Sequence, residues 1–370
     1  MRTIGSTRMW VVGATLLFGV GVARANDPFD TWAARYVAAW TLSGVAYGAD
    51  VFVAAADVIY TSPDGVCWTR RALAPPPLNG LNGVAYGNGR FVAVAEGAAY
   101  VSTNGTAWQR SADLPVDRLP VIQRIAFGGG TFLAVGQEPN PPPGSGGHWL
   151  VMTSPDGITW SRHPGPTDTG ESHYLNAAAY GNGLYVVGGW SGLPALQGLM
   201  LISTDLTTWA PVTGFPVSVV NGITYGNGKF VAVGSAIATS SDGVEWTKRE
   251  AGLPGGLSAV TFGAEQFVAV GDGGLLLSST DGVEWRQHTT SVDGFLGVTY
   301  GNGSFIAVGG FYTALPRGVA VQSGGRPQVC LEALGFGPVW APGFRVVLTA
   351  EGGAYRLQSS PLLPAISWTA

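Results

Sequence analysis

The feature that most constrains the fold is a segment that the chain repeats seven times. Each copy runs through an aromatic residue, a glycine-rich turn and an alternating apolar strand, as in GITYGNGKFVAVG at 222–234. The aromatic residues of the copies are Tyr47, Tyr86, Phe127, Tyr180, Tyr225, Phe262 and Tyr300. Subtracting these numbers gives spacings of 39, 41, 53, 45, 37 and 38 residues. A repeat of this length predicts an array of similar small units.

A second motif, here called the box, follows six of the copies. Its pattern is Ser-x-Asp-Gly-x-x-Trp with small variations, and its copies begin at Ser62, Ser102, Ser154, Ser203, Ser240 and Ser279. Each unit then holds four short strands, a to d. A glycine-containing turn, Gly-Asn-Gly in four units, joins a to b, and in six units the box joins c to d. The alternation has the period of a strand, and Asn-Gly and Asp-Gly tolerate the positive φ of tight hairpins. The pattern predicts an all-β fold, a seven-bladed β-propeller.

The seventh copy lacks its box, and the missing strand is found at the other end of the chain. The segment DTWAAR at 30–35 matches the tryptophan-plus-basic ending of EWTKR at 245–249. We therefore expect residues 30–36 to supply strand d of the last blade beside 318–323. Such a closure removes the free sheet edges that a linear array would leave.

Three segments divide the chain: a signal peptide at 1–25, the propeller at 26–328 and a small C-terminal β module at 329–370, whose completeness is left open. Arg2 and Arg8 precede an apolar run at 9–22, and small residues at 23–25 offer a cleavage site. The alternative is an uncleaved anchor, but the run is shorter than the ~20 apolar residues of a membrane span. The signal predicts a secreted, periplasmic or cell-surface protein with no membrane span after cleavage.

The composition fits many short strands and excludes two classes of partner. The 370 residues include 57 Gly and 24 Pro, and only 11% are charged. The net charge of −4 is spread without a run of like charges, so nucleic acid and anionic membrane surfaces are not expected partners. Two cysteines, Cys67 and Cys330, are too few for a disulfide scaffold. Export would permit one bridge between them, and whether they pair is left open.

The boxes resemble the Asp-box (BNR) repeats of sialidase-type propellers and of related exported bacterial proteins. The resemblance covers about 30–325 and implies a propeller with the box at the turn between the third and fourth strands. The spacing departs from the family pattern, since the box here is one residue shorter than Ser-x-Asp-x-Gly-x-x-Trp. The tail at 352–368 resembles the end of a small β module that follows such propellers. Neither resemblance specifies an activity.

Both kinds of turn have a functional and a structural interpretation. The box aspartates could bind calcium, but one Asp followed by Gly or Leu supplies too few oxygen ligands. We expect each Asp instead to accept its own turn's N–H groups while the tryptophan packs between sheets. Gly-Asn-Gly could cradle phosphate, but a strand follows it every time rather than a helix. We expect plain hairpin turns.

Both turn types must lie on one face of the ring, here called the turn face. The connections from b to c and from blade to blade lie on the opposite face, here called the loop face. Long insertions occur there at 137–149 in blade 3, 189–198 in blade 4 and 309–316 in blade 7, and the connection at 163–176 joins blades 3 and 4. Variable loops on one face of a repeat scaffold are where recognition is usually built.

The candidate ligand-binding residues gather on the loop face: Arg124, His148, Trp149, Asp168, Glu171, His173, Tyr174, Trp190 and Tyr312. Aromatic faces suit a sugar ring and carboxylates suit its hydroxyl groups. The alternative is that the aromatic residues fold down over their own loops. The histidine spacings match no metal motif, so neither a metal nor a cofactor is expected.

Strand a adds a ring of polar residues at the channel mouth, four positions before each aromatic residue. They are Ser43, Asn82, Gln123, Asn176, Asn221 and Ser258, with Leu296 in the seventh blade. These side chains could bind ligand or cap the incoming loops. The next position is Gly or Ala in six blades and Arg124 in blade 3, the clearest departure from the repeat.

The predicted function is non-catalytic: an exported, monomeric propeller that binds a glycan or a protein through the loop face of blades 3, 4 and 7. One alternative is a sialidase-like glycoside hydrolase, which by family analogy needs three arginines around a carboxylate. Here only Arg124 is suitably placed, and Asp168 and Glu171 share one loop, so they do not form a pair across a site. The other alternative is a scaffold or assembly factor without a small ligand.

Overall fold

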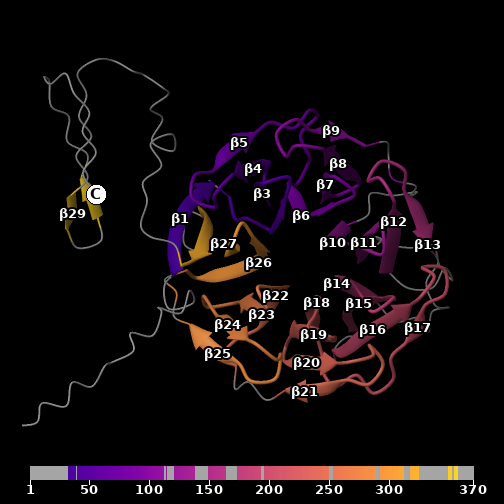
Figure 1. The fold of residues 1–370 in the computed structure, drawn as a ribbon. Coiled ribbons are helices and arrows are strands. Elements are labelled where there is room, and N and C mark those ends of the chain that lie inside the picture. The colour runs from indigo at the N-terminus through magenta and orange to yellow at the C-terminus, as the bar shows by residue number, and fades with distance from the viewer. Residues whose placement is uncertain are drawn as a thin grey trace, which may run out of the picture.

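The computed structural model describes most of the repeat region. The described residues are 32–38, 40–111, 114, 121–137, 149–163, 173–192, 196–249, 253–288, 290, 292–311, 317–324, 349–351 and 354–356. They form strands and turns and no helix, and the strands build seven four-stranded sheets around one axis (Figure 1). The predicted seven-bladed β-propeller is confirmed.

The two inner strands of each blade, a and b, come from the repeated segment. The a strands are β2 (Gly44–Gly48), β6 (Leu81–Gly87), β10 (Val121–Gly128), β14 (His173–Gly181), β18 (Val220–Gly226), β22 (Leu257–Gly263) and β26 (Gly294–Gly301). The b strands are β3 (Val51–Ala55), β7 (Arg90–Ala95), β11 (Thr131–Gln137), β15 (Leu184–Ser191), β19 (Lys229–Gly234), β23 (Gln266–Gly271) and β27 (Ser304–Phe311). In each turn between them, two residues have positive φ, as Asn227 (47°) and Gly228 (73°) do. Gly-Asn-Gly is therefore the predicted hairpin turn.

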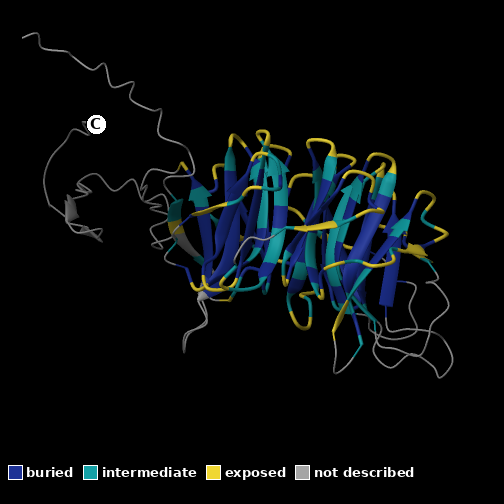
Figure 2. Cartoon of the chain, turned by 90° about the horizontal axis from the view of Figure 1, so that it is seen from below, coloured by how far each residue is buried: buried dark blue, intermediate teal, exposed yellow. Residues whose placement is uncertain are grey.

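The two outer strands flank the box. The c strands are β4 (Ile59–Ser62), β8 (Ala98–Ser102), β12 (Trp149–Ser154), β16 (Gln197–Ser203), β20 (Ile237–Ser240), β24 (Leu276–Ser279) and β28 (Arg317–Ser323). The d strands are β5 (Thr69–Arg71), β9 (Gln109–Arg110), β13 (Ser161–His163), β17 (Ala210–Pro211), β21 (Thr247–Arg249) and β25 (Arg286–His288), with β1 (Trp32–Ala38) in blade 7. Each sheet is antiparallel in the order a, b, c, d, and the exposed turns lie along the two rims of the ring (Figure 2).

The ring closes through the first described strand, as the sequence predicts. β1 pairs antiparallel with β28, and its register runs from Trp32 opposite Ser323 to Ala38 opposite Gly318. Blade 7 thus combines three strands from the end of the propeller with one from its beginning, and β1 lies at its outer edge (Figure 1).

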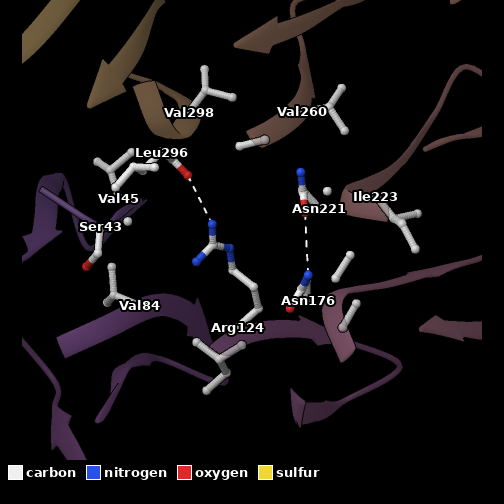
Figure 3. Close-up of a pocket in the computed structure, with 18 residues that line it drawn as sticks. Ser43, Val45, Val84, Arg124, Asn176, Asn221, Ile223, Val260, Leu296 and Val298 are labelled. Carbon is white, nitrogen blue, oxygen red and sulfur yellow. Dashed lines mark hydrogen bonds between the residues drawn. The ribbon is translucent and has the colours of Figure 1, made fainter. Parts of the chain in front are cut away.

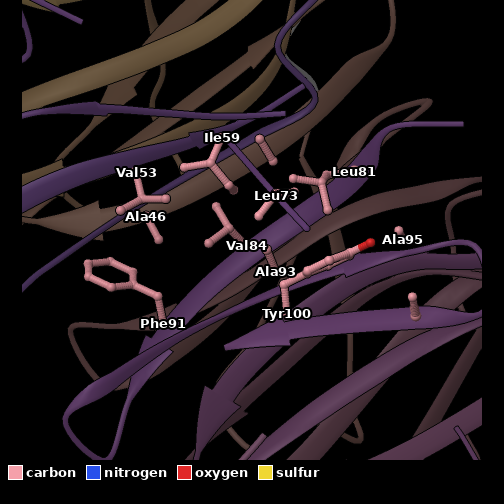
Figure 4. Packing of buried hydrophobic residues seen from close by; sticks show 12 residues of the cluster. Ala46, Val53, Ile59, Leu73, Leu81, Val84, Phe91, Ala93, Ala95 and Tyr100 are labelled. Atoms are coloured by element: carbon pink, nitrogen blue, oxygen red, sulfur yellow. The ribbon is translucent and has the colours of Figure 1, made fainter. Parts of the chain in front are cut away.

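The hydrophobic core is divided among the contacts between neighbouring blades. Among the described residues, seven clusters of buried side chains each join two adjacent blades. Between blades 1 and 2, for example, Phe91 and Tyr100 pack against Val53 and Ile59, all of them buried (Figure 4). Burial of one such large apolar side chain stabilises the fold by roughly 1.5–3 kcal/mol.

A second set of contacts explains the glycine that follows each aromatic residue. A Cβ added to Gly226 would lie 2.1 Å from the ring of Phe262 in the next blade. A Cβ would clash with the aromatic side chain of the next blade, at 2.1–2.3 Å, at each of the other six glycines: Gly48, Gly87, Gly128, Gly181, Gly263 and Gly301. At Gly128 the nearest atom is the Cβ of Tyr180. Each aromatic side chain therefore lies against the backbone of the preceding blade, which only glycine permits. The last of these contacts, Gly301 with Tyr47, joins blade 7 to blade 1.

The turn face is held together by hydrogen bonds between blades. The Gly-Asn-Gly asparagines of blades 2, 5 and 7 donate to carbonyl oxygens of the next blade's box: Asn88 to Pro155 at 2.9 Å, Asn227 to Thr280 at 3.4 Å and Asn302 to Pro63 at 3.4 Å. The side chains of these turns are engaged within the scaffold.

The ends of the chain lie largely outside the described residues. Strands β29 (Thr349–Glu351) and β30 (Ala354–Arg356) form a hairpin within the expected C-terminal module, and the three segment boundaries remain predictions. Within the described part of the chain, no helix has the length and hydrophobicity that crossing a bilayer requires. Cys67 is disulfide-bonded, and Cys330, the other cysteine of the sequence, is outside the described residues.

Candidate functional site

A cavity of about 150 Å³ lies at the mouth of the central channel on the loop face. Its walls are two or three consecutive residues from each of the seven a-strand segments, so every blade contributes (Figure 3). The a strand is the innermost strand of each sheet and pairs on one side only, with strand b. The mouth is therefore lined by strand edges and by the few side chains that point inward.

In six blades the polar ring predicted from the sequence lies at a β-bulge in strand a. In these blades the register of a with b skips one residue, and the skipped residues are Asn82, Gln123, Asn176, Asn221, Ser258 and Leu296. A bulged residue has no ladder partner, and the strand bends at it. The ring positions thus coincide with the point where each strand enters the channel wall.

Four polar side chains of this ring connect neighbouring blades, and Asn176 does so by donating from Nδ2 to Asn221 Oδ1 at 3.4 Å. Asn82 Nδ2 donates to the carbonyl oxygen of Ile122 at 2.8 Å, and Asn221 Nδ2 donates to that of Leu257 at 2.9 Å. Ser43 Oγ donates to the carbonyl oxygen of Leu81. Each of these three backbone carbonyl oxygens stands just before the bulge of the next blade. For Ser43, Asn82 and Asn221 the structure corresponds to the capping alternative.

Arg124 is different, because its side chain crosses the mouth. Nη2 donates to the carbonyl oxygen of Leu296 in blade 7 at 3.3 Å, and Nη1 donates to those of Asn82 at 3.4 Å and Gln123 at 3.1 Å (Figure 3). Burial lowers the pKa of the guanidinium below its usual range, although an arginine stays charged at neutral pH. Among the described residues that line the cavity, Arg124 is the only charged one.

Blade 4 carries a second group of predicted site residues. Its strand β14 has nine residues where β18 of blade 5 has seven, and β15 has eight where β19 has six. At the loop-face end of the longer pair, Tyr174 stands opposite Trp190 in the register. Their rings stack with centroids 3.9 Å apart and planes 19° apart, and both side chains are partly exposed. His173 is next to them and faces Ser191 across the pair.

Of the other predicted residues, only Trp149 is among those that the structure describes. Trp149 is only 7% exposed and packs between blades 3 and 4, because its strand, β12, places it in the core. This is the folded-down alternative for that residue. The remaining candidates, His148, Asp168, Glu171 and Tyr312, are outside the described residues. The cavity at Arg124 and the Tyr174–Trp190 pair are separate features, since neither aromatic residue is among those lining the cavity.

The bulges were missed by the sequence reasoning, although a signal for them exists. In five blades strand b has, within its last three residues, a glycine whose Cβ would come within 2.1 Å of a carbonyl oxygen just before the bulge: Gly136, Gly189, Gly234, Gly271 and Gly309. A glycine in a strand interior often marks such a close approach of two backbones. The repeated glycine therefore marks the level of the channel mouth.

The box turns have a structural chemistry that repeats in six blades. In blade 6, Asp281 Oδ1 accepts the N–H groups of Val283 at 2.8 Å and Glu284 at 3.0 Å, while Ser279 Oγ accepts that of Gly282. Trp285 Nε1 donates to the carbonyl oxygen of Gly282, a bond that, in the described part of the chain, five of the six boxes make and Trp209 of blade 4 does not. Asn104 accepts the equivalent N–H groups in blade 2, at 2.9 and 3.0 Å. Within the described part of the chain, no three His, Cys, Asp or Glu side chains gather closely enough to hold a metal ion.

These hydrogen bonds predict an acid sensitivity. The backbone N–H groups of Val283 and Glu284 hold the pKa of Asp281 below its ordinary value. An aspartate with a depressed folded pKa stabilises the fold above the unfolded value of ~3.9 and loses that contribution as pH falls below it. We expect Asp281→Ala to cost about 1 kcal/mol at pH 7, because the turn loses its acceptor.

The substitution Asp281→Asn separates the charge from the turn. It reproduces the turn of blade 2, so we expect it to cost less than Asp281→Ala at pH 7. We also expect it to weaken the loss of stability between pH 4 and pH 2. Urea unfolding at these pH values measures both. An identical pH profile for wild type and Asp281→Asn would contradict the role of the charge.

Comparison with known proteins adds to the fold. No protein-family profile and no curated protein matches the chain. Among solved structures, YCF48 bound to a D1 peptide is 14% identical, with a TM-score of 0.58 over 81% of this chain and 97% of that chain. YCF48 from Cyanidioschyzon merolae is also 14% identical, with a TM-score of 0.55 over 79% and 98%. The WD40 β-propeller domain of Doa1 is 12% identical, with a TM-score of 0.59 over 80% and 97%.

The fold is a β-propeller. At 12–14% identity the likeness shows the arrangement of the blades alone. A propeller of this kind is consistent with a non-catalytic ligand-binding role or a scaffold role.

Proposed function

We propose that the protein is an exported, non-catalytic binding protein that holds a segment of another protein on its loop face. The observation that carries this proposal is the loop-face end of β14 and β15 in blade 4. There the rings of Tyr174 and Trp190 stack with centroids 3.9 Å apart, and both side chains are partly exposed. Large aromatic side chains at a rigid strand end are typical anchors of protein interfaces. The pairing of both residues across β14 and β15 fixes their positions before a ligand arrives.

Two further observations support the loop face. Trp40, Leu78 and Leu196 are 59%, 80% and 41% exposed, and all three stand in connections on this face. Ile158 and Val244 are exposed to a similar degree as Leu196 but lie on the turn face. The loop face is therefore distinguished by Trp40 and Leu78, the two most exposed of the five. YCF48, a similar fold, is known bound to a D1 peptide, which supports a peptide ligand for a propeller of this shape.

The export part of the proposal is supported by the leader-like segment at 1–25 and by the disulfide-bonded Cys67. Disulfides persist in oxidising compartments such as the periplasm or the outside of the cell. On the basis of the six boxes, we further propose that the chain is related to the exported Asp-box propellers. We also propose a monomer.

A glycan is the second candidate ligand. The observation that favours it is the stacked geometry of the Tyr174–Trp190 pair, whose planes are 19° apart. Nearly parallel rings offer a flat apolar surface of the kind that can take one side of a sugar ring.

Parallel screens on a peptide array and a glycan array test the function. We expect the mature protein to retain peptides, and Tyr174→Ala or Trp190→Ala to lower the affinity for the selected peptide at least tenfold, a loss of about 1.4 kcal/mol. Ile158→Ala, an exposed apolar residue on the turn face (44% exposed), is the matched control and should bind like wild type.

The outcomes separate the candidates. Retention of glycans alone, with the same loss in both variants, would replace the peptide by a sugar at the same site. Binding that both variants leave unchanged would overturn the placement on blade 4. Turnover of an arrayed glycan would overturn the non-catalytic role.

A further inference from the structure

The charge of Arg124 is incompletely compensated by the described structure. All three of its hydrogen bonds go to backbone carbonyl oxygens, and two of them, at 3.3 and 3.4 Å, are longer than the usual range of 2.7–3.2 Å. The third bond goes to the residue's own neighbour, Gln123. A guanidinium has five N–H donors, so these bonds account for three of them.

The surroundings of Arg124 contain no compensating acid within the described residues. Apart from Arg124, the cavity is lined by Ser, Asn, Gly, Ala and branched aliphatic residues. The described cavity wall therefore holds one positive charge, at a site partly shielded from water, where a lone charge is costly to keep. A group of opposite charge would offset that cost.

The position also shows that Arg124 is an addition to the repeat. The equivalent residues of the other blades are Gly44, Gly83, Ala177, Gly222, Ala259 and Gly297. Their backbones approach closely around the ring, so that a Cβ on Gly44 would lie 3.2 Å from the Cα of Gly83. Six blades build this part of the wall without a long side chain. Closing the ring therefore does not by itself require an arginine.

We propose that the channel mouth is a carboxylate-binding site, in which Arg124 holds a single carboxylate group of a ligand on the loop face. An arginine binds a carboxylate through two parallel N–H···O bonds, and the two donors without a described acceptor allow this. Figure 3 shows the guanidinium in the middle of the mouth, with Ser43 on one side and Asn176 and Asn221 on the opposite side. This carboxylate would belong to the ligand of the proposed function, on which the proposal rests. Binding of a carboxylate at Arg124 can nevertheless be measured without knowing that ligand.

The size of the cavity fits the end of a ligand rather than a whole one. Its volume of about 150 Å³ is close to the volume that about five molecules occupy in liquid water. Sites for complete small ligands typically have volumes above about 300 Å³. A carboxylate with a short carbon stem fits. Its source is either the end or an acidic side chain of a peptide, or an acidic sugar.

The first test uses acetate as the probe. We expect acetate, against chloride at equal ionic strength, to shift the Nε–H resonance of Arg124 in ¹H–¹⁵N spectra, with a dissociation constant on the order of millimolar. It should also raise the melting temperature. Arg124→Ala reproduces the small residue of the other blades, and we expect it to fold and to lose the acetate-dependent rise. Arg124→Lys should bind at least tenfold more weakly, because an ammonium lacks the paired donors.

Arg286→Ala, an exposed arginine on the outer strand β25, is the matched control and should respond to acetate like wild type. An equal acetate effect in Arg124→Ala would overturn the site. The site would also be overturned by two results together: an Nε–H resonance that saturating acetate does not shift, and a melting temperature in chloride that Arg124→Ala lowers. Arg124 would then have a purely structural role, as a link between blades across the channel.

The second test separates the two sources of the carboxylate. Peptides with a free C-terminus are compared with their C-terminal amides, and glucuronic acid is compared with glucose. Loss of binding on amidation supports a peptide terminus, and preference for glucuronic acid supports an acidic sugar. If Tyr174→Ala abolishes peptide binding while acetate still binds at Arg124, both proposals hold. If neither substitution at blade 4 matters but acetate binds, the placement of the proposed function on blade 4 fails and the carboxylate site stands.

Discussion

Removal of residues 26–38 from a chain that begins at residue 26 will lower the melting temperature by at least about 10 °C and promote association. The deletion takes away β1, so β28 loses its outer partner along a register of six residue pairs, from Trp32–Ser323 to Ala38–Gly318, and keeps only β27. Each lost hydrogen bond costs about 1 kcal/mol, and a free edge strand in a flat sheet pairs readily with another molecule. Loss of several kcal/mol from a domain of this size shifts the melting temperature by roughly this amount.

The matched control is a chain that begins at residue 26 and keeps β1. We expect it to unfold in one cooperative transition and to elute as a monomer. A synthetic peptide of residues 30–38, added to the deleted chain, should restore part of the lost stability by pairing with β28. Equal melting temperatures with and without β1 would show that the pairing contributes nothing to closure. Differential scanning calorimetry and size-exclusion chromatography measure these outcomes.

The second large effect is expected at a box tryptophan. Trp160 is 8% exposed, packs in the cluster between blades 2 and 3 and donates from Nε1 to the carbonyl oxygen of Gly157 at 3.1 Å. Trp160→Ala removes a large buried ring and leaves a cavity, which costs roughly 3–5 kcal/mol. Urea denaturation of wild type and variant measures the difference.

Trp68 provides the internal comparison, because it occupies the same box position in blade 1 but is only partly buried. Its hydrogen bond to the carbonyl oxygen of Gly65, at 3.1 Å, matches that of Trp160. We expect Trp68→Ala to cost less, since less ring surface leaves the core. An equal loss at both positions would assign the effect to the shared hydrogen bond and not to burial.

The fold could be predicted because its determinants are local and repeated. Gly-Asn-Gly and the boxes specify their turns within a few residues, and Tyr225 or Trp246 recurs at the same place in each unit. The closing strand could be predicted as well, since the last unit lacks a segment that the first described strand supplies. These arguments need no knowledge of how distant residues meet.

The candidate site depends on distant contacts, and there the sequence was less informative. Arg124 could be recognised as a departure from the repeat, but its bond to Leu296 across the channel joins residues 172 positions apart. Trp149 belongs to an inserted loop by its sequence position, yet the start of β12 includes it and turns its ring into the core. Side chains alternate between the two faces of a strand, so a shift of one residue in where the strand begins changes whether a residue at the loop end faces the core or solvent.

The contacts between Gly226 and Phe262, and their six equivalents, have a consequence for how the number of blades is set. Each unit presents one flat backbone surface and one ring, and Gly301 meets Tyr47 only if the accumulated rotation from blade to blade returns to its start. A chain with one unit deleted or duplicated keeps every pairwise contact along the array but must change the angle at all of them to close. The count of seven is therefore a property of the whole circle, enforced at each junction by a space that has no room for a methyl group.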